Sequence, residues 1–509
     1  MTLRTLRRIL AATFIVLITL LLVDIRGVME PAFGWMAKLQ FLPAVLSLNA
    51  AVIIGLLLLT LVFGRVYCSI ICPLGVFQDL VANLSKRLRR KRKHRTYYSP
   101  AKTWLRCGVL AAFVICLVAG LNQIVALLAP YSAYGRMVNS FLAPLYKLAN
   151  NGMANVAERV GSYSFYSVDI LWPKSLPVLI VAALTLIVIV VLAVRGGRTY
   201  CNTICPVGTV LGFLSKFSLL KPVIDATKCN KCGMCERQCK ASCIDSLSHA
   251  IDYSRCVSCM SCIDACKHRH AIGYTYAPGL QKGERKAVDK PTEPKPGPAV
   301  DGSRRAFLSA TATVVAATAL HGQESAVDGG YAVIEAKRIP QRATPITPPG
   351  SISARNLMKH CTACQLCVSA CPNDVLRPSN DLAHFMQPHS SYEVGYCRPE
   401  CTRCADVCPT GAIRPIDVAQ KASLQIGHAV WVRDNCVCIT DGVSCGNCAR
   451  HCPTGAIQMV PLDADVPNSV SIPVVNVERC IGCGACENLC PARPFSAIYV
   501  EGHEEHRSI

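Results

Sequence analysis

Four apolar stretches separated by polar loops dominate the first 200 residues of the chain. They cover residues 9–23, 41–63, 105–129 and 176–194. A helix needs about 20 apolar residues to cross a bilayer, so the second and third stretches are long enough alone, and the first and fourth with their flanks. A buried core helix is a reasonable alternative only for the first stretch, and the arginines before it favour insertion. The pattern predicts an α-helical membrane domain of four helices over residues 1–220.

The loops indicate how such a domain would be oriented. Residues 86–95 contain eight Lys or Arg, whereas residues 131–174 contain four. The positive-inside rule therefore places the first loop in the cytoplasm and the second on the opposite side, with both ends of the unit cytoplasmic. The net charge of +21 is concentrated in such loops, and iron–sulfur clusters would offset part of it. Nucleic acid is therefore not expected as a partner.

A sequence repeat lies inside the helical unit. Residues 64–75 (GRVYCSIICPLG) recur as residues 197–208 (GRTYCNTICPVG), with eight of twelve positions identical. Each copy follows a helix running from outside to inside, which predicts two parallel hairpin repeats related by an axis along the membrane normal. That axis could bring together four cysteines: Cys68, Cys72, Cys201 and Cys205. They would hold a further iron–sulfur centre or act as redox thiols, and a structural turn is the third interpretation.

The apolar stretches lack ligands for haem. None of the 12 histidines lies in them, and no Cys-x-x-Cys-His is present, which excludes paired-His haem in the bilayer and covalent c-type haem. By elimination, a quinone dissolved in the membrane is the expected mobile carrier. Tyr131, Tyr134 and Arg136 are candidate contacts at the outer face, with interfacial anchoring as the alternative role of the tyrosines.

Two complete ferredoxin-type cysteine runs occupy residues 221–277, and the iron–sulfur domains are expected to have an α+β ferredoxin-like fold. In two-cluster ferredoxins the first three cysteines of a run hold one cluster and the fourth ligates the other. One [4Fe-4S] cluster is therefore expected on Cys229, Cys232, Cys235 and Cys266, and the second on Cys256, Cys259, Cys262 and Cys239. Lys240 and Lys267 stand where proline usually follows, and a nearby positive charge favours the reduced cluster. Cys243 is left over, with ligand, reactive and inert roles all open.

Four more cysteine runs fill residues 356–509. Their cysteines are Cys361, Cys364, Cys367 and Cys371; Cys397, Cys401, Cys404 and Cys408; Cys438, Cys445, Cys448 and Cys452; and Cys480, Cys483, Cys486 and Cys490. The third run also contains Cys436, and spacing does not choose between Cys436 and Cys438. Sixteen ligands supply four [4Fe-4S] clusters. We expect the outer two runs to exchange fourth ligands with each other, and the inner two likewise.

The segment between the two sets predicts that they lie on opposite sides of a membrane. Residues 278–302 are rich in Lys, Glu, Pro and Gly and are expected to form a tether. Residues 303–325 begin SRRAFL and continue with a weakly apolar run, the form of a twin-arginine export signal. A fifth transmembrane helix with a chance Arg-Arg pair is the alternative. Residues 326–355 form a linker, and we expect the signal to remain uncut as an anchor.

The motif order resembles two proteins of periplasmic nitrate reduction. Residues 1–277 resemble NapH, a membrane polyferredoxin, in their four helices, two Cys-x3-Cys-Pro motifs and two cysteine runs. Residues 303–500 resemble NapG, a twin-arginine-exported protein with four [4Fe-4S] clusters. The resemblance extends to NosR, MauM and MauN. CcoG-like oxidase-assembly proteins share the membrane unit and the first ferredoxin, without a four-cluster exported part.

This resemblance implies a quinol dehydrogenase of the bacterial inner membrane, with residues 221–277 cytoplasmic and residues 326–509 periplasmic. About six [4Fe-4S] clusters would carry electrons from menaquinol or ubiquinol to a periplasmic c-type cytochrome or reductase, a nitrate reductase system being the leading acceptor. The expected partners are the quinone pool, that acceptor and the twin-arginine translocase. The alternative function is a redox maturation or sensing factor for a metalloenzyme, as for NosR or CcoG.

Overall fold

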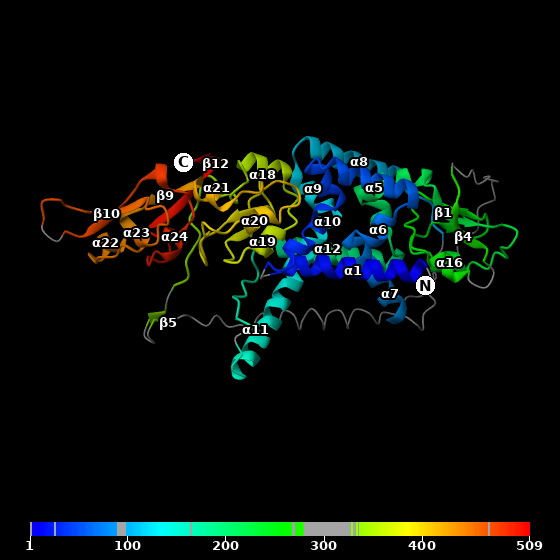
Figure 1. The fold of residues 1–509 in the computed structure, drawn as a ribbon, viewed down its shortest axis with the longest axis horizontal. Helices are drawn as coiled ribbons and strands as arrows, with labels where there is room; N and C mark the ends of the chain where they lie inside the picture. The colour runs from blue at the N-terminus through cyan, green and yellow to red at the C-terminus, as the bar shows by residue number, and fades with distance from the viewer. Residues whose placement is uncertain are drawn as a thin grey trace, which may run out of the picture.

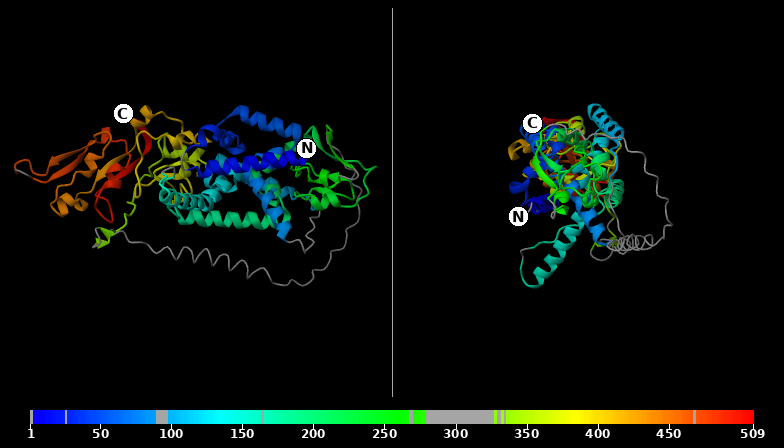
Figure 2. Two further views of the ribbon diagram at one scale, coloured as in Figure 1. Left: turned by 60° about the horizontal axis from the view of Figure 1, so that its bottom comes forward. Right: turned by 90° about the vertical axis from the view of Figure 1, so that its right-hand side faces the viewer.

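The computed structural model describes residues 3–24, 27–88, 98–162, 165–266, 270–278, 327–328, 332–333, 335–466 and 469–509. Over these residues the chain forms a helical body with a cysteine-rich part at each end, and Figures 1 and 2 show the three in a row along the longest axis. The predicted tether beyond Pro278, the predicted export signal and most of the basic segment 86–95 lie outside the described residues.

Two long apolar helices run through the helical body. They are α1 (Leu3–Val23) and α12 (Leu176–Gly196). Both are long and apolar enough to cross a membrane, a property that buried core helices and signal sequences can share. They correspond to the first and fourth predicted helices.

The second and third predicted helices are each broken in two. Their pieces are α4 (Phe41–Leu46), α5 (Ala50–Phe63), α8 (Thr103–Val118) and α9 (Asn122–Leu128). Leu48 and Gly120 interrupt them with φ of 53° and 77°, and the Asn49 side chain then caps α5 by accepting from the Val52 N–H. The prediction of uninterrupted helices over residues 41–63 and 105–129 is therefore wrong, because hydropathy alone does not register such turns.

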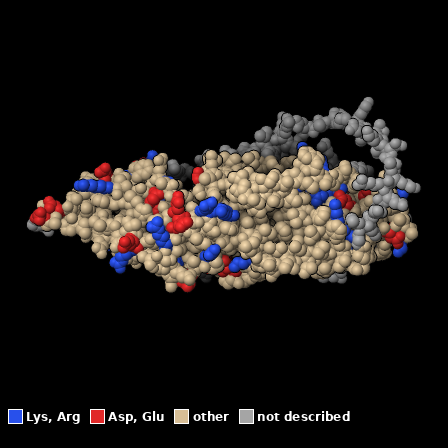
Figure 3. Space-filling model, turned by 90° about the horizontal axis from the view of Figure 1, so that it is seen from above, with Lys and Arg blue, Asp and Glu red and all other residues tan. Residues whose placement is uncertain are grey.

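The outer surface of the helical body is apolar. Large side chains such as Leu58 on α5, Ile115 on α8 and Leu184 on α12 are more than half exposed, at 54%, 66% and 57%. On the face drawn in Figure 3, charged side chains gather towards the two ends and leave a largely uncharged surface between them. Exposed large apolar side chains on a largely uncharged surface are typical of contact with lipid or another protein.

Each copy of the sequence repeat folds into two short helices that turn back into the body. The four helices are α6 (Val66–Ile70), α7 (Pro73–Leu88), α13 (Thr199–Thr203) and α14 (Pro206–Leu214). The proline of each Cys-Pro pair starts the second helix, where a missing N–H costs nothing. Helix α10 (Pro130–Met137) packs on α7. It continues into the π-helix η1 (Val138–Leu142) and α11 (Ala143–Arg159), and α11 projects from the body (Figure 1).

The cysteine-rich part after the helical body has the expected α+β character. Its elements are β1 (Leu220–Ile224), α15 (Met234–Gln238), β2 (Ile244–Asp245), β3 (Ala250–Ile251), α16 (Ser261–Ala265) and β4 (Ile272–Tyr276). Strand β1 pairs antiparallel with β4, and β2 pairs with β3. We call this part the N-terminal ferredoxin.

The C-terminal part combines short helices with two-stranded antiparallel sheets. Its strand pairs are β7 (Leu376–Pro378) with β8 (Pro388–Ser390), β9 (Leu424–Trp431) with β12 (Ile498–Ser508), and β10 (Ile457–Pro461) with β11 (Ser471–Val475). Its principal helices are α18 (Ala354–His360), α19 (Leu366–Ala370), α20 (Arg403–Asp406), α23 (Asn447–Arg450) and α24 (Ala485–Leu489). Several of these strands pack on the helices: β7 on α19, β10 on α23 and β12 on α24.

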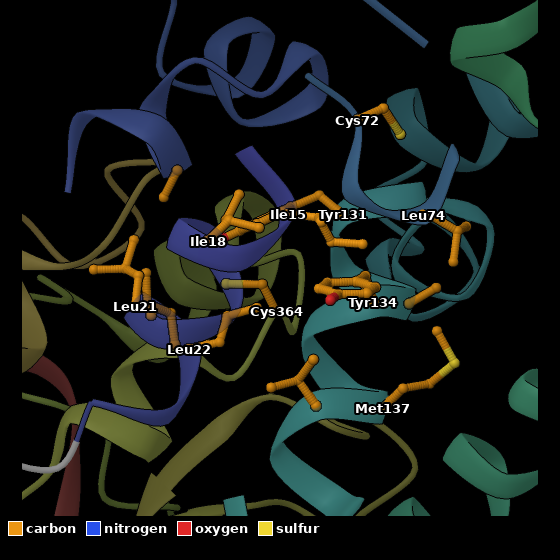
Figure 4. Close-up of a cluster of buried hydrophobic side chains, with 14 of the residues drawn as sticks. Ile15, Ile18, Leu21, Leu22, Cys72, Leu74, Tyr131, Tyr134, Met137 and Cys364 are labelled. Carbon is orange, nitrogen blue, oxygen red and sulfur yellow. The ribbon is translucent and has the colours of Figure 1, made fainter. Parts of the chain in front are cut away.

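One hydrophobic core connects all three parts of the molecule. It includes Val257 from the N-terminal ferredoxin, Cys72 and Tyr134 from the helical body, and Cys364 and Cys404 from the C-terminal part. Figure 4 shows Cys72, Tyr134 and Cys364 within this cluster of buried side chains. Both cysteine-rich parts are therefore packed against the helical body through apolar contacts.

Candidate metal centres

The regular cysteine runs share one loop conformation. In each, the residues two and four positions after the first cysteine have positive φ: Lys231 and Gly233, Ser258 and Met260, Ala363 and Gln365, and Gly482 and Gly484. Two left-handed residues in so short a loop turn it tightly enough for its three cysteines to converge. Side chains held in this region are strained, and strain of this kind is typical of ligand-binding loops.

The N-terminal ferredoxin gathers the four cysteines expected for its second cluster. Cys239, Cys256, Cys259 and Cys262 line one pocket of about 390 Å³, part of it open to solvent. The leftover Cys243 also lines it, with its sulfur 3.5 Å from that of Cys239. Hydrogen bonding from Cys243 lowers the pKa of Cys239 to about 6.

In the C-terminal part, the first two runs exchange their fourth cysteines. Cys371 lines one pocket together with Cys397, Cys401 and Cys404. Cys408 in turn lies close enough to Cys361, Cys364 and Cys367 to interact with them electrostatically. Helix α19 packs on α20, which brings these two consecutive runs together.

The last two runs are paired in the same way. Cys490 lines a pocket with Cys445, Cys448 and both Cys436 and Cys438. Cys452 interacts electrostatically with the loop of Cys480 and Cys483, and α23 packs on α24. The nested pairing is therefore wrong, because each run packs on its neighbour in the chain rather than on a distant run.

The two pairs of runs are joined end to end. The Cys397 N–H donates to the Cys483 carbonyl at 2.9 Å, and the buried Tyr392 hydroxyl donates to the Gly482 carbonyl at 2.7 Å. The pair that contains Cys364 belongs to the core shared with the helical body, while the pair that contains Cys480 has its own core farther out. The cysteine sets thus follow one another away from the body.

These sets fit iron–sulfur clusters better than single ions. Across the described residues, no group of three or more His, Cys, Asp or Glu is arranged to hold one metal ion. The cysteine-lined pockets instead enclose about 360–390 Å³, part of it open to solvent. Four thiolates around such a space are the ligand set of a [4Fe-4S] cluster, which supplies one-electron transfer when bound.

The four cysteines of the Cys-x3-Cys-Pro repeats meet inside the helical body. Cys68, Cys72, Cys201 and Cys205 are each no more than 4% exposed, and all six pairs among them interact electrostatically. Gln78 Nε2 donates to the Cys201 sulfur at 3.3 Å. Such burial disfavours exchange with an outside dithiol, which requires access to the sulfur.

Reciprocal arginine contacts hold the two repeats together. Arg65 Nη2 donates to the Cys201 carbonyl at 3.2 Å, and Arg198 Nη1 donates to the Cys68 carbonyl at 2.5 Å. These arginines occupy the same position in the two copies, so the two repeats contact each other in a reciprocal, pseudo-twofold way. The shared Gly-Arg of each copy was the sequence signal for this contact, and cysteine spacing alone did not reveal it.

A buried carboxylate, which sequence reasoning missed, ties the N-terminal ferredoxin to the body. Asp79 on α7 pairs with Arg198 at 2.9 Å, with Lys240 at 3.1 Å and with Arg7 at 3.2 Å. Burial alone would raise the pKa of Asp79, but Arg198 and Lys240 hold it well below its usual range. Lys240, which follows a cluster cysteine, is thus engaged by Asp79.

The residues proposed as quinone contacts are buried inside the molecule. Tyr131, Tyr134 and Arg136 are 2%, 5% and 1% exposed, so interfacial anchoring of the tyrosines is wrong: the C-terminal part covers the face on which they lie. The Tyr134 hydroxyl pairs with that of Thr19 at 2.6 Å. Arg136 donates to the Ala126 carbonyl, and burial lowers its pKa to about 10, which leaves it charged at neutral pH.

Comparison with known proteins agrees with this ligand chemistry. A 4Fe-4S binding domain matches residues 48–92 and 178–224, which contain the two Cys-x3-Cys-Pro motifs. A second 4Fe-4S binding domain matches residues 253–275 and 358–374, and a 4Fe-4S dicluster domain matches residues 438–493. The dicluster match joins the third and fourth runs, as their geometry does.

The similar proteins are ferredoxin-type proteins. The methylamine utilization ferredoxin-type protein MauM of Methylobacillus flagellatus is 32% identical over 167 residues, which are 32% of this chain and 70% of that protein. MauM of Methylophilus methylotrophus is 34% identical over 171 residues, or 32% of this chain and 72% of that protein. The chain belongs to the MauM family of ferredoxin-type proteins.

The ferredoxin-type protein NapF of Escherichia coli K12 is also similar to this member of the MauM family. It is 28% identical over 159 residues, or 31% of this chain and 87% of NapF. The resemblance to Nap-, NosR- and MauM-related proteins is thereby confirmed, and the chain is a ferredoxin-type iron–sulfur electron-transfer protein. No solved structure matches it.

Proposed function

We propose that this protein is a membrane-bound quinol dehydrogenase that delivers electrons to a periplasmic acceptor. The observation that carries the proposal is the row of cysteine sets, with the N-terminal ferredoxin at one end of an apolar helical body and the C-terminal sets at the other. In this proposal the two cluster-bearing parts would face opposite sides of a membrane. The twin-arginine signal expected over residues 303–325 would export the C-terminal part after its clusters are built.

The apolar surface of the helical body supports the membrane location. Helices α1 and α12 suit a bilayer by length and composition, and side chains such as Leu58 and Ile115 face outward. The broken helices α4–α5 and α8–α9 would also lie within the bilayer. Their interruptions are tolerable there where other protein segments satisfy the freed backbone groups.

Buried charge supports an additional iron–sulfur centre on the four thiols of the repeats. The described part of residues 3–217 buries five arginines, Arg7, Arg65, Arg106, Arg136 and Arg198, against one acid, Asp79. Buried cations need counter-charges. Thiolates of a bound centre on Cys68, Cys72, Cys201 and Cys205 would supply them beside Arg65 and Arg198, which already contact this site.

The chain's own residues would orient and shield such a centre. Arg65 and Arg198 fix the two repeats through opposite carbonyl groups, and Gln78 holds the Cys201 sulfur. The buried core around them excludes water, which strengthens these electrostatic contacts. Tyr131 and Tyr134 fill the space between the thiols and the first C-terminal loop.

The proposed acceptor is a periplasmic c-type cytochrome or reductase. The relatives carry names from methylamine utilization and from the Nap group, and a nitrate reductase system remains our proposal on the resemblance to NapH and NapG. Such an acceptor would dock at the far C-terminal end, near α23 and β10, where the last cysteine set lies.

An anaerobic quinol titration tests the proposed function. The purified, cluster-loaded protein is titrated with a short-chain menaquinol or ubiquinol while electron paramagnetic resonance follows the clusters. We expect cluster reduction in proportion to added quinol, with two electrons taken from each. A protein whose clusters dithionite reduces but quinol leaves oxidised would refute the dehydrogenase and favour a maturation or sensing role.

A further inference from the structure

A pocket opens where the helical body meets the C-terminal part. It encloses about 600 Å³, part of it open to solvent, and is lined mainly by apolar residues of the body, with polar contributions from Gln365, the N-cap of α19, and from Ser369 on α19. Representative lining residues are Val23, Ala143, Trp172, Val178, Gln365 and Ser369. Small-molecule sites commonly combine an apolar wall with a few fixed polar groups in this way.

Gln365 presents an unpaired donor at this pocket. Its side chain is 2% exposed, and its Oε1 accepts from Asn139 Nδ2 at 2.9 Å. Its Nε2 has no hydrogen-bond partner among the residues that the structure describes. A buried amide donor left unpaired costs about 1–3 kcal/mol, so a ligand oxygen at this position would be bound favourably.

The two cations beside the pocket already share one carboxylate. Lys147 and Lys174 line it, and both pair with Asp374, at 2.8 and 2.9 Å. Their remaining contacts are the carbonyl groups of Asp169 and Val368. An anionic phosphate would have to compete with Asp374 for these lysines, whereas an uncharged ligand with polar oxygens would leave their contacts in place.

The pocket also lies beside a cysteine set and an apolar approach. Gln365 stands between Cys364 and Cys367 in the first C-terminal loop. At the outer side, Leu176 and Ile180 at the start of α12 are 60% and 52% exposed, and Ile170 on the pocket wall is 40% exposed. A lipid-soluble molecule with a long apolar tail could reach the inner end along these side chains.

We infer that this pocket binds the head group of a quinol, with Gln365 Nε2 donating to one ring oxygen. The inference rests on the proposed function and adds the location of its substrate. It also moves the substrate site away from the buried Tyr131–Arg136 segment to the junction formed by α1, α11, α12 and α19. The flat quinol ring would lie between Trp172 and the apolar wall, and the quinol tail would extend towards the exposed residues of α12.

Photolabelling of the full, cluster-loaded protein with an azidoquinone tests this site. We expect labelled peptides to come from residues 139–147, 170–179 or 365–369, and labelling to be competed by a short-chain ubiquinol. Gln365→Leu should reduce the competed labelling about tenfold, because the variant loses one hydrogen bond from a buried donor to the ligand. Ser369→Leu, which narrows the pocket from the same helix, should reduce it as well.

Gln387→Leu is the matched control. Gln387 is also 2% exposed and donates to the Met358 carbonyl in the same part of the molecule, but it does not line the pocket. Labelling of the Gln387→Leu variant should equal that of the wild type. The iron content of all three variants is measured to show that they retain their clusters.

The outcomes separate the site from the function. The site is overturned if ubiquinol competes label on other peptides, or if labelling is unchanged in both pocket variants. In either case, the proposed function still stands as long as quinol reduces the clusters. Label that ubiquinol does not compete, spread over the apolar helices, reports partitioning only and also overturns the site. Failure of quinol to reduce the clusters removes the proposed function and the site with it.

Discussion

The carbonyl oxygen of Cys364 lies 2.3 Å from the point where a Cβ atom on Gly135 would stand. Only glycine allows this approach, so the backbone of a cysteine loop in the C-terminal part rests directly on helix α10 of the body. Around it, Asn122 Nδ2 donates to the Met358 carbonyl at 2.7 Å. The junction is thus closely packed, as expected of a permanent contact between the two parts.

Gly135→Val should weaken the attachment of the C-terminal part to the helical body. The added atoms meet backbone, which cannot rotate away, and overpacking of this kind costs about 1–3 kcal/mol. The measurement is co-purification of the two halves after cleavage at a protease site placed in residues 278–302. Gly152→Val is the control, because nothing lies within 4 Å of its added Cβ. Equal co-purification of the halves in Gly135→Val and in the control would contradict the junction.

Joint replacement of Cys72 and Cys205 by alanine should remove one iron–sulfur centre. We expect the protein to lose about four iron atoms and their labile sulfide, measured on anaerobically purified protein. The matched control replaces Cys107 and Cys116, which lie on α8 outside the thiol cluster, and should retain all iron. An equal iron content in both variants would eliminate the additional centre.

Asp79→Asn should weaken the docking of the N-terminal ferredoxin on the helical body. Three cations lose their shared carboxylate, and removing one partner of a buried ion pair costs about 3–5 kcal/mol. Hydrogen exchange of the segments around Arg198 and Lys240 should then accelerate about a hundredfold or more. Asp225→Asn is the control, since its pair with Lys228 is largely exposed, and it should leave exchange unchanged. Unaltered exchange in Asp79→Asn would contradict the docking role.

The same contact has a defined pH dependence. Because the pKa of Asp79 is depressed in the folded protein, its stabilisation is fully present above the ordinary carboxyl pKa of about 4. It is lost only as the pH falls through the depressed value. The hydrogen-exchange rate around Lys240, corrected for the pH dependence of intrinsic exchange, should therefore stay constant across neutral and mildly acidic pH. A marked rise at mildly acidic pH would show that another group controls the contact.

The pairing of consecutive runs can be tested by counting iron in double variants. Cys371 and Cys404 belong to one set, so Cys371→Ser with Cys404→Ser should cost a single cluster. Cys367→Ser with Cys371→Ser should cost two clusters, although these cysteines are neighbours in the sequence. Equal iron loss in the two double variants would reject the exchange of fourth ligands.

Local sequence patterns predicted the ligand loops well, because a Cys-x2-Cys-x2-Cys spacing dictates a tight turn such as that at Ala363 and Gln365. Long-range pairing was not encoded in that spacing, and the nested arrangement failed for this reason. Hydropathy likewise found the apolar stretches but not the turns at Leu48 and Gly120. The ion pairs of Asp79 join residues distant in the chain, and no local pattern marks them.

The central claim is that two N-terminal sets, one set in the helical body and four C-terminal sets form a single row. Cryo-electron microscopy of the full chain, purified without oxygen and held in lipid nanodiscs, tests it most directly. The account predicts strong cluster density on Cys68, Cys72, Cys201 and Cys205, inside the lipid belt, with the other clusters continuing the row on both sides. An empty central site, or two cluster-bearing parts on the same side of the belt, would contradict it.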